Sequence, residues 1–367
     1  MGDTMSRART GVLAALALAC AVWPAGHAGA TGVQEPLLRP STLARSPMSV
    51  LMLDAAAAGD RLVAVGERGT VLLSDNAGAT WQQVDTPTSV TLTAVRFASR
   101  TQGWVAGHYG MIMATTDGGG HWKEQLDGVA AAKAALDYAH GLAPGEEQRE
   151  RLVAEAERLV ADGADKPFFD LYFLDERRGF AVGAYNLFFH TEDGGRTWRP
   201  CLDRLANPKG NHLYAIRGQG PNLYIAGEQG VLFRSTDSGR TFTRLPSPYA
   251  GSFFTMAVLP TGELIVAGLR GNVFRSVDSG DTWKRLEGLP PISWLASAVG
   301  ADGNLWLGNQ GGQVFTSRDK GESWAMVPQV PGAPALPLTG LLPLGQGKVL
   351  MTSMRGLGLI EVPANPK

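Results

Sequence analysis

The sequence of 367 residues predicts an all-β protein, a seven-bladed β-propeller with a helical hairpin inserted between blades two and three. Three observations lead to this prediction. An octet of the form Ser/Thr-x-Asp-x-Gly-x-x-Trp occurs six times, with Asn or Phe as single replacements. Successive octets lie 41 to 44 residues apart, except for one gap of 76 residues between Asp117 and Asp193. Short apolar runs separated by turn residues precede each octet. A constant period of this length indicates a repeat architecture.

Each repeat supplies four short strands. In the first repeat, the apolar run at residues 62–65 leads through a Gly-x-x-Gly turn at residues 66–69 into a second run at residues 70–73. Another strand-like run lies farther upstream in the later repeats, as at residues 91–97, and a segment led by the octet Trp follows. Four short strands bounded by turns form one propeller blade.

A seventh unit lacks the octet but keeps three strand-like runs, at residues 338–342, 348–352 and 355–360. This unit needs a fourth strand from elsewhere, and the stretch at residues 36–38 is our candidate. A strand from the N-terminal region would tie the two ends of the chain together and remove the open sheet edges of a linear array.

The long gap contains an insertion, residues 127–166, with helical composition. Residues 129–139 are rich in alanine, and a Pro-Gly breaker follows. Apolar residues then recur at helical spacing: Leu152, Val153, Ala156, Leu159 and Val160. We expect a helical hairpin on the same face as the Gly-x-x-Gly turns. It is either a neutral insertion packed on the rim or a part of the binding surface, because insertions on rigid scaffolds often carry function.

Residues 1–30 predict a signal peptide. Arg7 and Arg9 precede an apolar run at residues 11–23, and Ala28-Gly29-Ala30 is a small-residue cleavage site. Cleavage would leave residues 31–367 as an exported propeller, in the periplasm or in a compartment like the thylakoid lumen. A lipoprotein anchored through Cys20 is the less favoured alternative, because this cysteine lies inside the apolar run.

Composition excludes several classes of protein. The chain has 33 Lys and Arg against 34 Asp and Glu, without a basic tract, so we expect no nucleic-acid partner. Outside the leader, no run reaches the roughly 18 apolar residues of a membrane-spanning helix. Cys201 is the one cysteine outside the leader and occupies a position that is apolar in other repeats. We expect a buried hydrophobic residue, with a reactive thiol as the alternative.

The octet has a structural explanation. An Asp side chain in a tight turn accepts backbone N–H bonds from residues just downstream, and Asn can do the same. Carboxylates one blade apart cannot form an acid/base pair, since glycosidases need two within about 5–10 Å. We therefore expect a structural role for all six positions: Asn76, Asp117, Asp193, Asp237, Asp278 and Asp319.

The octet resembles the Asp-box, or BNR repeat. Together with turns such as residues 66–69, 107–110 and 227–230, it makes the chain resemble the photosystem II stability and assembly factor family of cyanobacteria and plastids. The resemblance covers residues 49–361 apart from the insertion. It implies a propeller without enzymatic activity that helps assemble a membrane-protein complex, and the expected partner is that complex or one of its subunits. We expect the protein to be a monomer. In a bacterium without photosynthesis, the client would be an envelope transporter.

One residue of each Gly-x-x-Gly turn, the one before the second Gly or its equivalent, is expected on a common face: Arg68, Tyr109, Asn186, Gln229, Arg270, Gln310 and Arg355. Blades one and seven are neighbours in a closed ring, so Arg68 and Arg355 should lie close together, and three arginines can grip carboxylates. The family resemblance also implies an arginine-rich patch. The predicted partner-binding residues are Arg68, Arg270, Arg355, Tyr109, Gln229 and Gln310. The alternative is that these are ordinary solvated turn residues.

No catalytic constellation is recognisable. The six histidines are dispersed without metal-ligand spacing, and no nucleophile elbow or phosphate-binding loop occurs. We expect no catalytic residue, no metal and no cofactor. Two other functions stay open. A sialidase-like glycan hydrolase would need an Arg-Ile-Pro segment, which Leu38-Arg39-Pro40 matches only weakly. The second open function is that of a propeller that binds carbohydrate or peptide and has no role in assembly.

Overall fold

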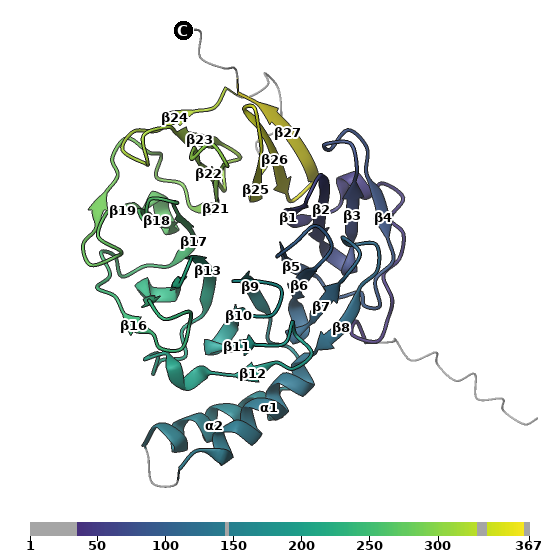
Figure 1. The fold of residues 1–367 in the computed structure, drawn as a ribbon, viewed down its shortest axis with the longest axis vertical. Coiled ribbons are helices and arrows are strands. Elements are labelled where there is room, and N and C mark those ends of the chain that lie inside the picture. The colour runs from purple at the N-terminus through teal and green to yellow at the C-terminus, as the bar shows by residue number, and fades with distance from the viewer. Residues whose placement is uncertain (1–34, 144–146, 329–335, 363–367) are drawn as a thin grey trace, which may run out of the picture. The chain divides into compact units, whose positions relative to one another are not determined.

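Seven β-sheets form a ring (Figure 1) in a computed structural model that describes residues 35–143, 147–328 and 336–362. The inner strands of the ring line a central channel. Each inner strand packs beside the inner strand of the next blade, and the seventh packs beside the first. Among the described residues, six sheets have four strands and the seventh has three. The predicted seven-bladed propeller with a helical hairpin is therefore confirmed.

The strands follow one order in every blade, from the channel outward. The inner strands are β1 (Met52–Ala58), β5 (Leu92–Phe97), β9 (Phe168–Phe173), β13 (Leu213–Gln219), β17 (Phe253–Val258), β21 (Trp294–Val299) and β25 (Leu338–Gly345). The second strands are β2 (Arg61–Gly66), β6 (Gly103–Gly107), β10 (Gly179–Gly183), β14 (Asn222–Gly227), β18 (Leu264–Gly268), β22 (Leu305–Asn309) and β26 (Lys348–Ser353). The third strands are β3 (Val71–Ser74), β7 (Ile112–Thr115), β11 (Phe188–Thr191), β15 (Leu232–Ser235), β19 (Val273–Ser276), β23 (Val314–Ser317) and β27 (Gly356–Glu361). The outer strands are β4 (Gln82–Val84), β8 (Lys123–Leu126), β12 (Arg199–Pro200), β16 (Thr243–Arg244), β20 (Lys284–Arg285) and β24 (Ala325–Met326).

The inner strands share an irregularity that shapes the channel. In β1 the pairing with β2 shifts between Met52 and Asp54, so Leu53 has no partner, and the other six inner strands skip the corresponding residue. Such a bulge re-aims the unpaired side chain. All seven unpaired residues line the channel: Leu53, Thr93, Phe169, Tyr214, Phe254, Leu295 and Thr339.

The Gly-x-x-Gly turns lie over the starts of the inner strands. In blade one, the N–H of Glu67 donates to Leu51 O at 3.0 Å, and an equivalent bond recurs in all seven blades. The second glycine packs on the chain that enters the next blade. Gly356, with φ of 104°, lies so close to Met48 O that a Cβ would collide with it. The turns therefore surround the channel mouth and also join neighbouring blades.

The ring does not close in the way that the sequence suggested. Ser89 N–H donates to Pro36 O at 3.0 Å, and Leu37 is buried at the junction of blades one and two. Our prediction that residues 36–38 supply the fourth strand of blade seven is therefore wrong. The physical reason is that an apolar slot between the first two blades receives Leu37. The ring closes instead where β25 packs beside β1, and where the short turn at Pro47–Ser49 packs against β27.

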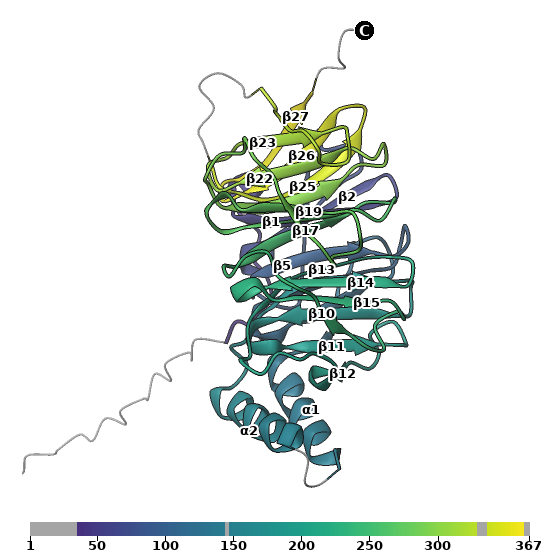
Figure 2. The same cartoon turned by 90° about the vertical axis from the view of Figure 1, so that its left-hand side faces the viewer.

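The insertion forms two antiparallel helices, α1 (Gly128–Gly141) and α2 (Glu147–Asp162), beside the outer edge of blade three (Figures 1 and 2). Asp127 Oδ1 caps α1 by accepting from Ala130 N at 2.7 Å. Gly128 lies against Gly110, so the insertion starts beside a Gly-x-x-Gly turn. Its apolar side joins the hydrophobic core of blades two and three. Burial, followed by a hydrogen bond with Asp203, raises the pKa of Tyr138 on α1.

Candidate functional site

The residues predicted to bind a partner lie on one face of the ring. Four of the turn positions hold a non-glycine residue in the left-handed backbone region, with φ between 54° and 57° at Arg68, Tyr109 and Arg270, and 51° at Gln229. Such a backbone is uncommon for residues with a Cβ. Five of the six predicted side chains are exposed, and the sixth, Tyr109, is half-buried against the core of blades one and two.

In blade three the predicted residue, Asn186, is wrong by one position: Tyr185 is the equivalent of Arg68. Tyr185 has the left-handed backbone, with φ of 51°, whereas Asn186 replaces the second glycine. Asn186 is fully buried, and its Oδ1 accepts a hydrogen bond from Asn207 Nδ2 at 2.9 Å. The exposed residue of this turn is therefore Tyr185. The missing second glycine concealed the correct register in the sequence.

The three predicted arginines are free to bind. Within the part of the chain that the structure describes, none of the guanidinium groups of Arg68, Arg270 and Arg355 has an acidic partner within 4.0 Å. The turns of Arg68 and Arg355 belong to adjacent blades, but residues 48–51 run between them. Met48 contacts Gly356 of the blade-seven turn, and Leu51 O accepts a hydrogen bond from Glu67 N of the blade-one turn.

An aromatic cluster occupies the same face over blades three to five. Phe169, Tyr214 and Phe254 are the bulged residues of three consecutive inner strands, with ring centroids 5.4 Å apart in both neighbouring pairs. His212 joins them through contacts with Phe169 and Tyr214, and Tyr185 packs on the His212 ring at 4.7 Å. We refer to these five residues as the aromatic cluster.

Sequence reasoning missed this cluster. Its signal was present, because Phe169, Tyr214 and Phe254 occupy the same position in three successive repeats. Only the bulge, however, turns that position toward the channel mouth. Tyr185 is 56% exposed and carries Lys166 Nζ 5.3 Å from its ring centroid. The cluster therefore offers an accessible aromatic surface with a cation beside it.

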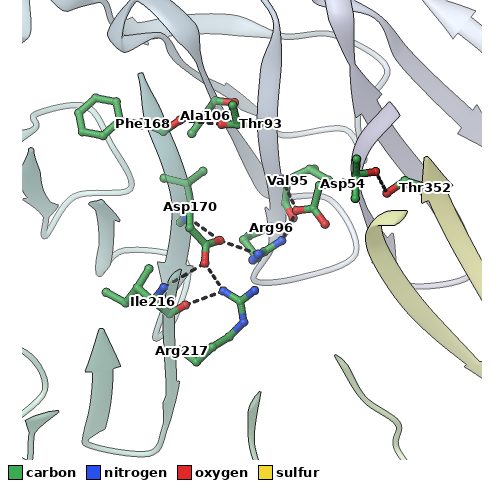
Figure 3. A network of polar contacts seen from close by, with 12 residues as sticks. Asp54, Thr93, Val95, Arg96, Ala106, Phe168, Asp170, Ile216, Arg217 and Thr352 are labelled. Atoms are coloured by element: carbon green, nitrogen blue, oxygen red, sulfur yellow. Dashed lines mark hydrogen bonds and ion pairs between the residues drawn. The ribbon is translucent and has the colours of Figure 1, made fainter. Parts of the chain in front are cut away.

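Below the mouth, four charged side chains form a ladder across blades one to four (Figure 3). Arg96 bonds to Asp54 on one side and to Asp170 on the other, the latter at 2.6 Å from Nη2 to Oδ1. Arg217 bonds to the second oxygen of Asp170. Backbone N–H groups complete the network: Val95 N donates to Asp54 and Ile216 N donates to Asp170, each at 3.0 Å. The ladder ties four blades together.

The charges of the ladder compensate one another. Burial lowers the pKa of Arg96, but Asp54 and Asp170 more than offset that effect, so the pKa lies above its ordinary value. Asp54 and Asp170 each directly follow the bulged residue of their inner strand. Blades five to seven have uncharged residues at this position: Thr255, Ala296 and Gly340. The charged residues therefore line one side of the channel only. The channel has a volume of about 440 Å³. Arg217, 26% exposed, keeps Nε and Nη2 without a partner among the described residues.

The Asp-boxes lie on the opposite face, because each one connects the third strand of a blade to the outer strand. In blade two, Asp117 Oδ1 accepts from Thr115 Oγ1 at 2.8 Å and from His121 N at 3.0 Å. The same two bonds recur in the other five boxes, at Asn76, Asp193, Asp237, Asp278 and Asp319. The octet therefore holds its own turn and keeps the acidic side chains far from the aromatic cluster.

Other sequence predictions concern the cysteine, metal sites and the membrane. Cys201 is fully buried and its pKa is raised by burial, which confirms the prediction of a buried hydrophobic residue. In the described ranges, no three His, Cys, Asp or Glu residues are grouped as metal ligands. No described helix is both long and apolar enough to cross a membrane. The signal-peptide prediction falls on residues outside those described.

Comparisons with known proteins address the family. The model of the family described as photosynthesis system II assembly factor YCF48 matches residues 56–139 and 152–287, more than half of the chain. A photosystem II assembly lipoprotein Ycf48 of Synechococcus sp. (strain CC9902) is 37% identical over 76 residues, 21% of this chain and 23% of that protein. A photosystem II assembly protein Ycf48 of Synechococcus sp. (strain JA-2-3B'a(2-13)) is 26% identical over 200 residues, 50% of this chain and 58% of that protein. The chain thus matches less than two thirds of either relative.

Solved structures share the fold. YCF48 bound to D1 peptide has a TM-score of 0.62 at 16% identity, over 89% of this chain and 97% of that one. A streptogramin B lyase has a TM-score of 0.65 at 13% identity, over the same shares of the two chains. At such identities the similarity shows the fold alone, and an assembly factor and a lyase fit equally well. The family match is what distinguishes them, and it shows that this chain belongs to the photosynthesis system II assembly factor YCF48 family.

Proposed function

We propose that this protein is a non-enzymatic assembly factor that binds a segment of a membrane-protein subunit on the face formed by the Gly-x-x-Gly turns. The observation that carries the proposal is the combination on one face of exposed arginines without acidic partners and an aromatic cluster. Arginine binds carboxylates with several fixed donors, and aromatic rings bind apolar side chains. A peptide segment with both acidic and apolar residues fits this surface.

The family supports the same ligand class. One solved relative is described as bound to a D1 peptide. We propose that this chain likewise binds a polypeptide segment, and that its client is a photosystem subunit in a photosynthetic organism and an envelope transporter in any other. The hydrolase alternative gains no support from the channel, because Asp54 and Asp170 are both engaged by arginines.

Client capture from solubilised membranes tests this proposal. The Arg68→Glu/Arg355→Glu variant should retain its stability, since both side chains are exposed, and should capture at least about tenfold less client at low salt. Arg240→Glu is the matched control, because Arg240 is exposed and lies in an Asp-box on the other face. Equal capture by the double variant and the control would contradict the proposal.

The aromatic cluster needs its own variant. Tyr185→Ala removes the most exposed ring of the cluster, and Tyr185 contributes little to the core, being 56% exposed. We expect weaker capture at both low and high salt, because an apolar contact is not screened by ions. A Tyr185→Ala protein that captures the client as well as the wild type would remove the cluster from the binding surface.

We also propose that the protein is exported. One curated relative is a lipoprotein by name, so our preference for cleavage at Ala30 over lipidation of Cys20 has no support from the comparisons. The two routes give different mature proteins. Intact mass spectrometry would find either a chain beginning at Thr31 or a lipidated chain beginning at Cys20. If the protein isolated from cells still carries the N-terminal segment with Arg7 and Arg9, the proposal of export is contradicted.

A further inference from the structure

The junction of blades six and seven differs from the first five junctions in how side chains meet the next blade. At the first five junctions, a side chain donates to a backbone carbonyl in the Asp-box of the following blade. The bonds are Arg61 to Gly118 O, Trp104 to Gly194 O, Arg204 to Gly239 O, Arg234 to Ser279 O and Arg275 to Lys320 O. Blade seven has no Asp-box, so blade six has no such acceptor.

Two buried polar groups remain unpaired at this junction. Trp306 is the second residue of β22, as Trp104 is of β6, and Thr316 is the third residue of β23, where Arg234 and Arg275 stand in blades four and five. Trp306 and Thr316 are directly paired across the two strands. Their Nε1 and Oγ1 atoms have no partner among the described residues, although the side chains are only 4% and 8% exposed. A buried donor without an acceptor is costly.

The residues that carry these two groups line a cavity. It has a volume of about 460 Å³ and lies between the β21–β22 turn of blade six and the β25–β26 turn of blade seven, on the Asp-box face. At other junctions an Asp-box aromatic fills the equivalent place. Trp122, for example, packs with Val63 and Leu73 of the preceding blade. Blade seven supplies no such ring against blade six.

The outer edge of blade seven is open as well. Among the residues that the structure describes, β27 pairs with β26 and with no strand on its other side. A second cavity, of about 290 Å³, lies beside it and is lined by apolar side chains of both blades, including Val327, Leu338, Met351 and Ile360. Leu359 on β27 is 45% exposed. In the other six blades a short outer strand covers this edge.

We propose that the junction of blades six and seven is a second binding site, which accepts an extended segment of a partner protein in place of the Asp-box that blade seven lacks in sequence and of an outer strand, which the described residues of this blade do not form. The segment would pair with β27 as an added strand. It would place an aromatic side chain in the cavity beside Trp306, and one of its backbone carbonyls would accept from Trp306 Nε1. The six complete blades define this occupant, since each covers the same position with a strand, an aromatic ring and a turn.

A peptide taken from the chain itself is a suitable probe. Residues 276–287 form the Asp-box and outer strand of blade five, with Trp283 as the aromatic residue. A fluorescein-labelled copy should bind the full mature protein saturably in an anisotropy titration. The same peptide with Ala in place of the residue equivalent to Trp283 should bind about tenfold more weakly. Absence of saturable binding up to about 1 mM peptide would overturn the proposal.

Variants of the protein localise the binding. Leu359→Lys should weaken binding about tenfold, because a charge then borders the apolar cavity. Val277→Lys is the matched control, since Val277 is 64% exposed on another blade. Trp306→Phe removes the free donor and should weaken binding about fivefold; its melting temperature should fall somewhat, because the smaller ring leaves space in the core of blades six and seven. Equal affinity of the Leu359→Lys and Val277→Lys proteins would overturn the proposal.

Two other occupants would also be revealed. If the peptide binds only after residues 363–367 are removed, the chain fills its own site and the partner proposal fails. If the protein self-associates and Leu359→Lys makes it monomeric, a second copy is the occupant and the proposal also fails. Arg355 lines the cavity beside β27, so the double arginine variant does not separate the two sites. The Tyr185→Ala variant does: it should bind the peptide normally, because Tyr185 lies in the turn of blade three on the other face. A failure of the proposed function would therefore leave this test intact.

Discussion

At the residue scale, the six Asp-boxes show how one side chain can hold a turn. In blade five, Asp278 Oδ1 accepts from the backbone N–H of Thr282 at 2.9 Å and from Ser276 Oγ at 2.8 Å. Hydrogen bonds to the ionised form favour that form. The hydroxyl and the N–H of Thr282, then the hydroxyl of Ser276, accordingly lower the pKa of Asp278 from its usual 3.8 to about 2.

This shift predicts a pH dependence of stability. A carboxyl group with a lowered pKa in the folded state stabilises the fold above its unfolded pKa, and the contribution is lost as the pH falls through the folded pKa. The free energy of unfolding should therefore decrease between about pH 4 and pH 2. Asp278→Asn should flatten part of this decrease in denaturant titrations. Asp60→Asn, at a side chain that is 90% exposed, should not.

Two tryptophans at equivalent positions give a second prediction. Trp104 Nε1 donates to Gly194 O of the next blade at 3.1 Å, whereas Trp306 Nε1 has no acceptor among the described residues. Trp104→Phe removes a hydrogen bond that Trp306 does not make, while Gly194 O keeps its bond from Gln125 Nε2, so it should cost about 0.5–1.5 kcal/mol more than Trp306→Phe. Chemical denaturation of the two variants measures the difference. Equal losses would show that the hydrogen bond between blades contributes nothing.

At the element scale, the helical hairpin was predictable from its composition and spacing, but its role in the core was not. Leu152, Ala156 and Leu159 of α2 are buried in the same cluster as Trp104 and Phe189. Helical periodicity shows which side of a helix is apolar, but not which strand that side will cover. The insertion therefore contributes to the core of blades two and three, which the sequence did not predict.

Replacing residues 129–163 with a short Gly/Ser linker tests this contribution. The ring should still form, because the seven inner strands are unaffected, but loss of the apolar helix side should lower the melting temperature by at least about 4 °C. Thermal unfolding followed by circular dichroism measures the change. A melting temperature equal to that of the wild type would make the hairpin a neutral insertion. Full client capture by the shortened protein would exclude it from the binding face.

At the scale of the whole molecule, the repeat period was enough to predict the number of blades, because each blade is a local unit of four strands. Contacts between distant segments were not predictable. The destination of Leu37 depends on an apolar slot that exists only after blades one and two have packed together. The aromatic cluster likewise arises from three blades and a shared bulge. The repeat pattern was enough to predict that the arginines of the turns share one face. That residues 48–51 separate the turns of Arg68 and Arg355 could be seen only in the structure.

The last prediction concerns closure of the ring. Removing residues 345–367 takes away β26 and β27, and with them Leu350, which packs against Met52 and Leu72 of blade one. This loss exposes the sheet edge of β25 and the core of blade one, so the truncated protein should aggregate or unfold. Leu37→Ala should behave differently: it leaves a cavity between blades one and two and should lower stability by about 2–5 kcal/mol, while the protein stays monomeric. Light scattering after gel filtration, together with thermal unfolding, separates the two outcomes. If residues 36–38 closed the ring, Leu37→Ala would open blade seven and aggregate like the truncation. A truncated protein that is monomeric with an unchanged melting temperature would show that the propeller does not depend on its seventh blade.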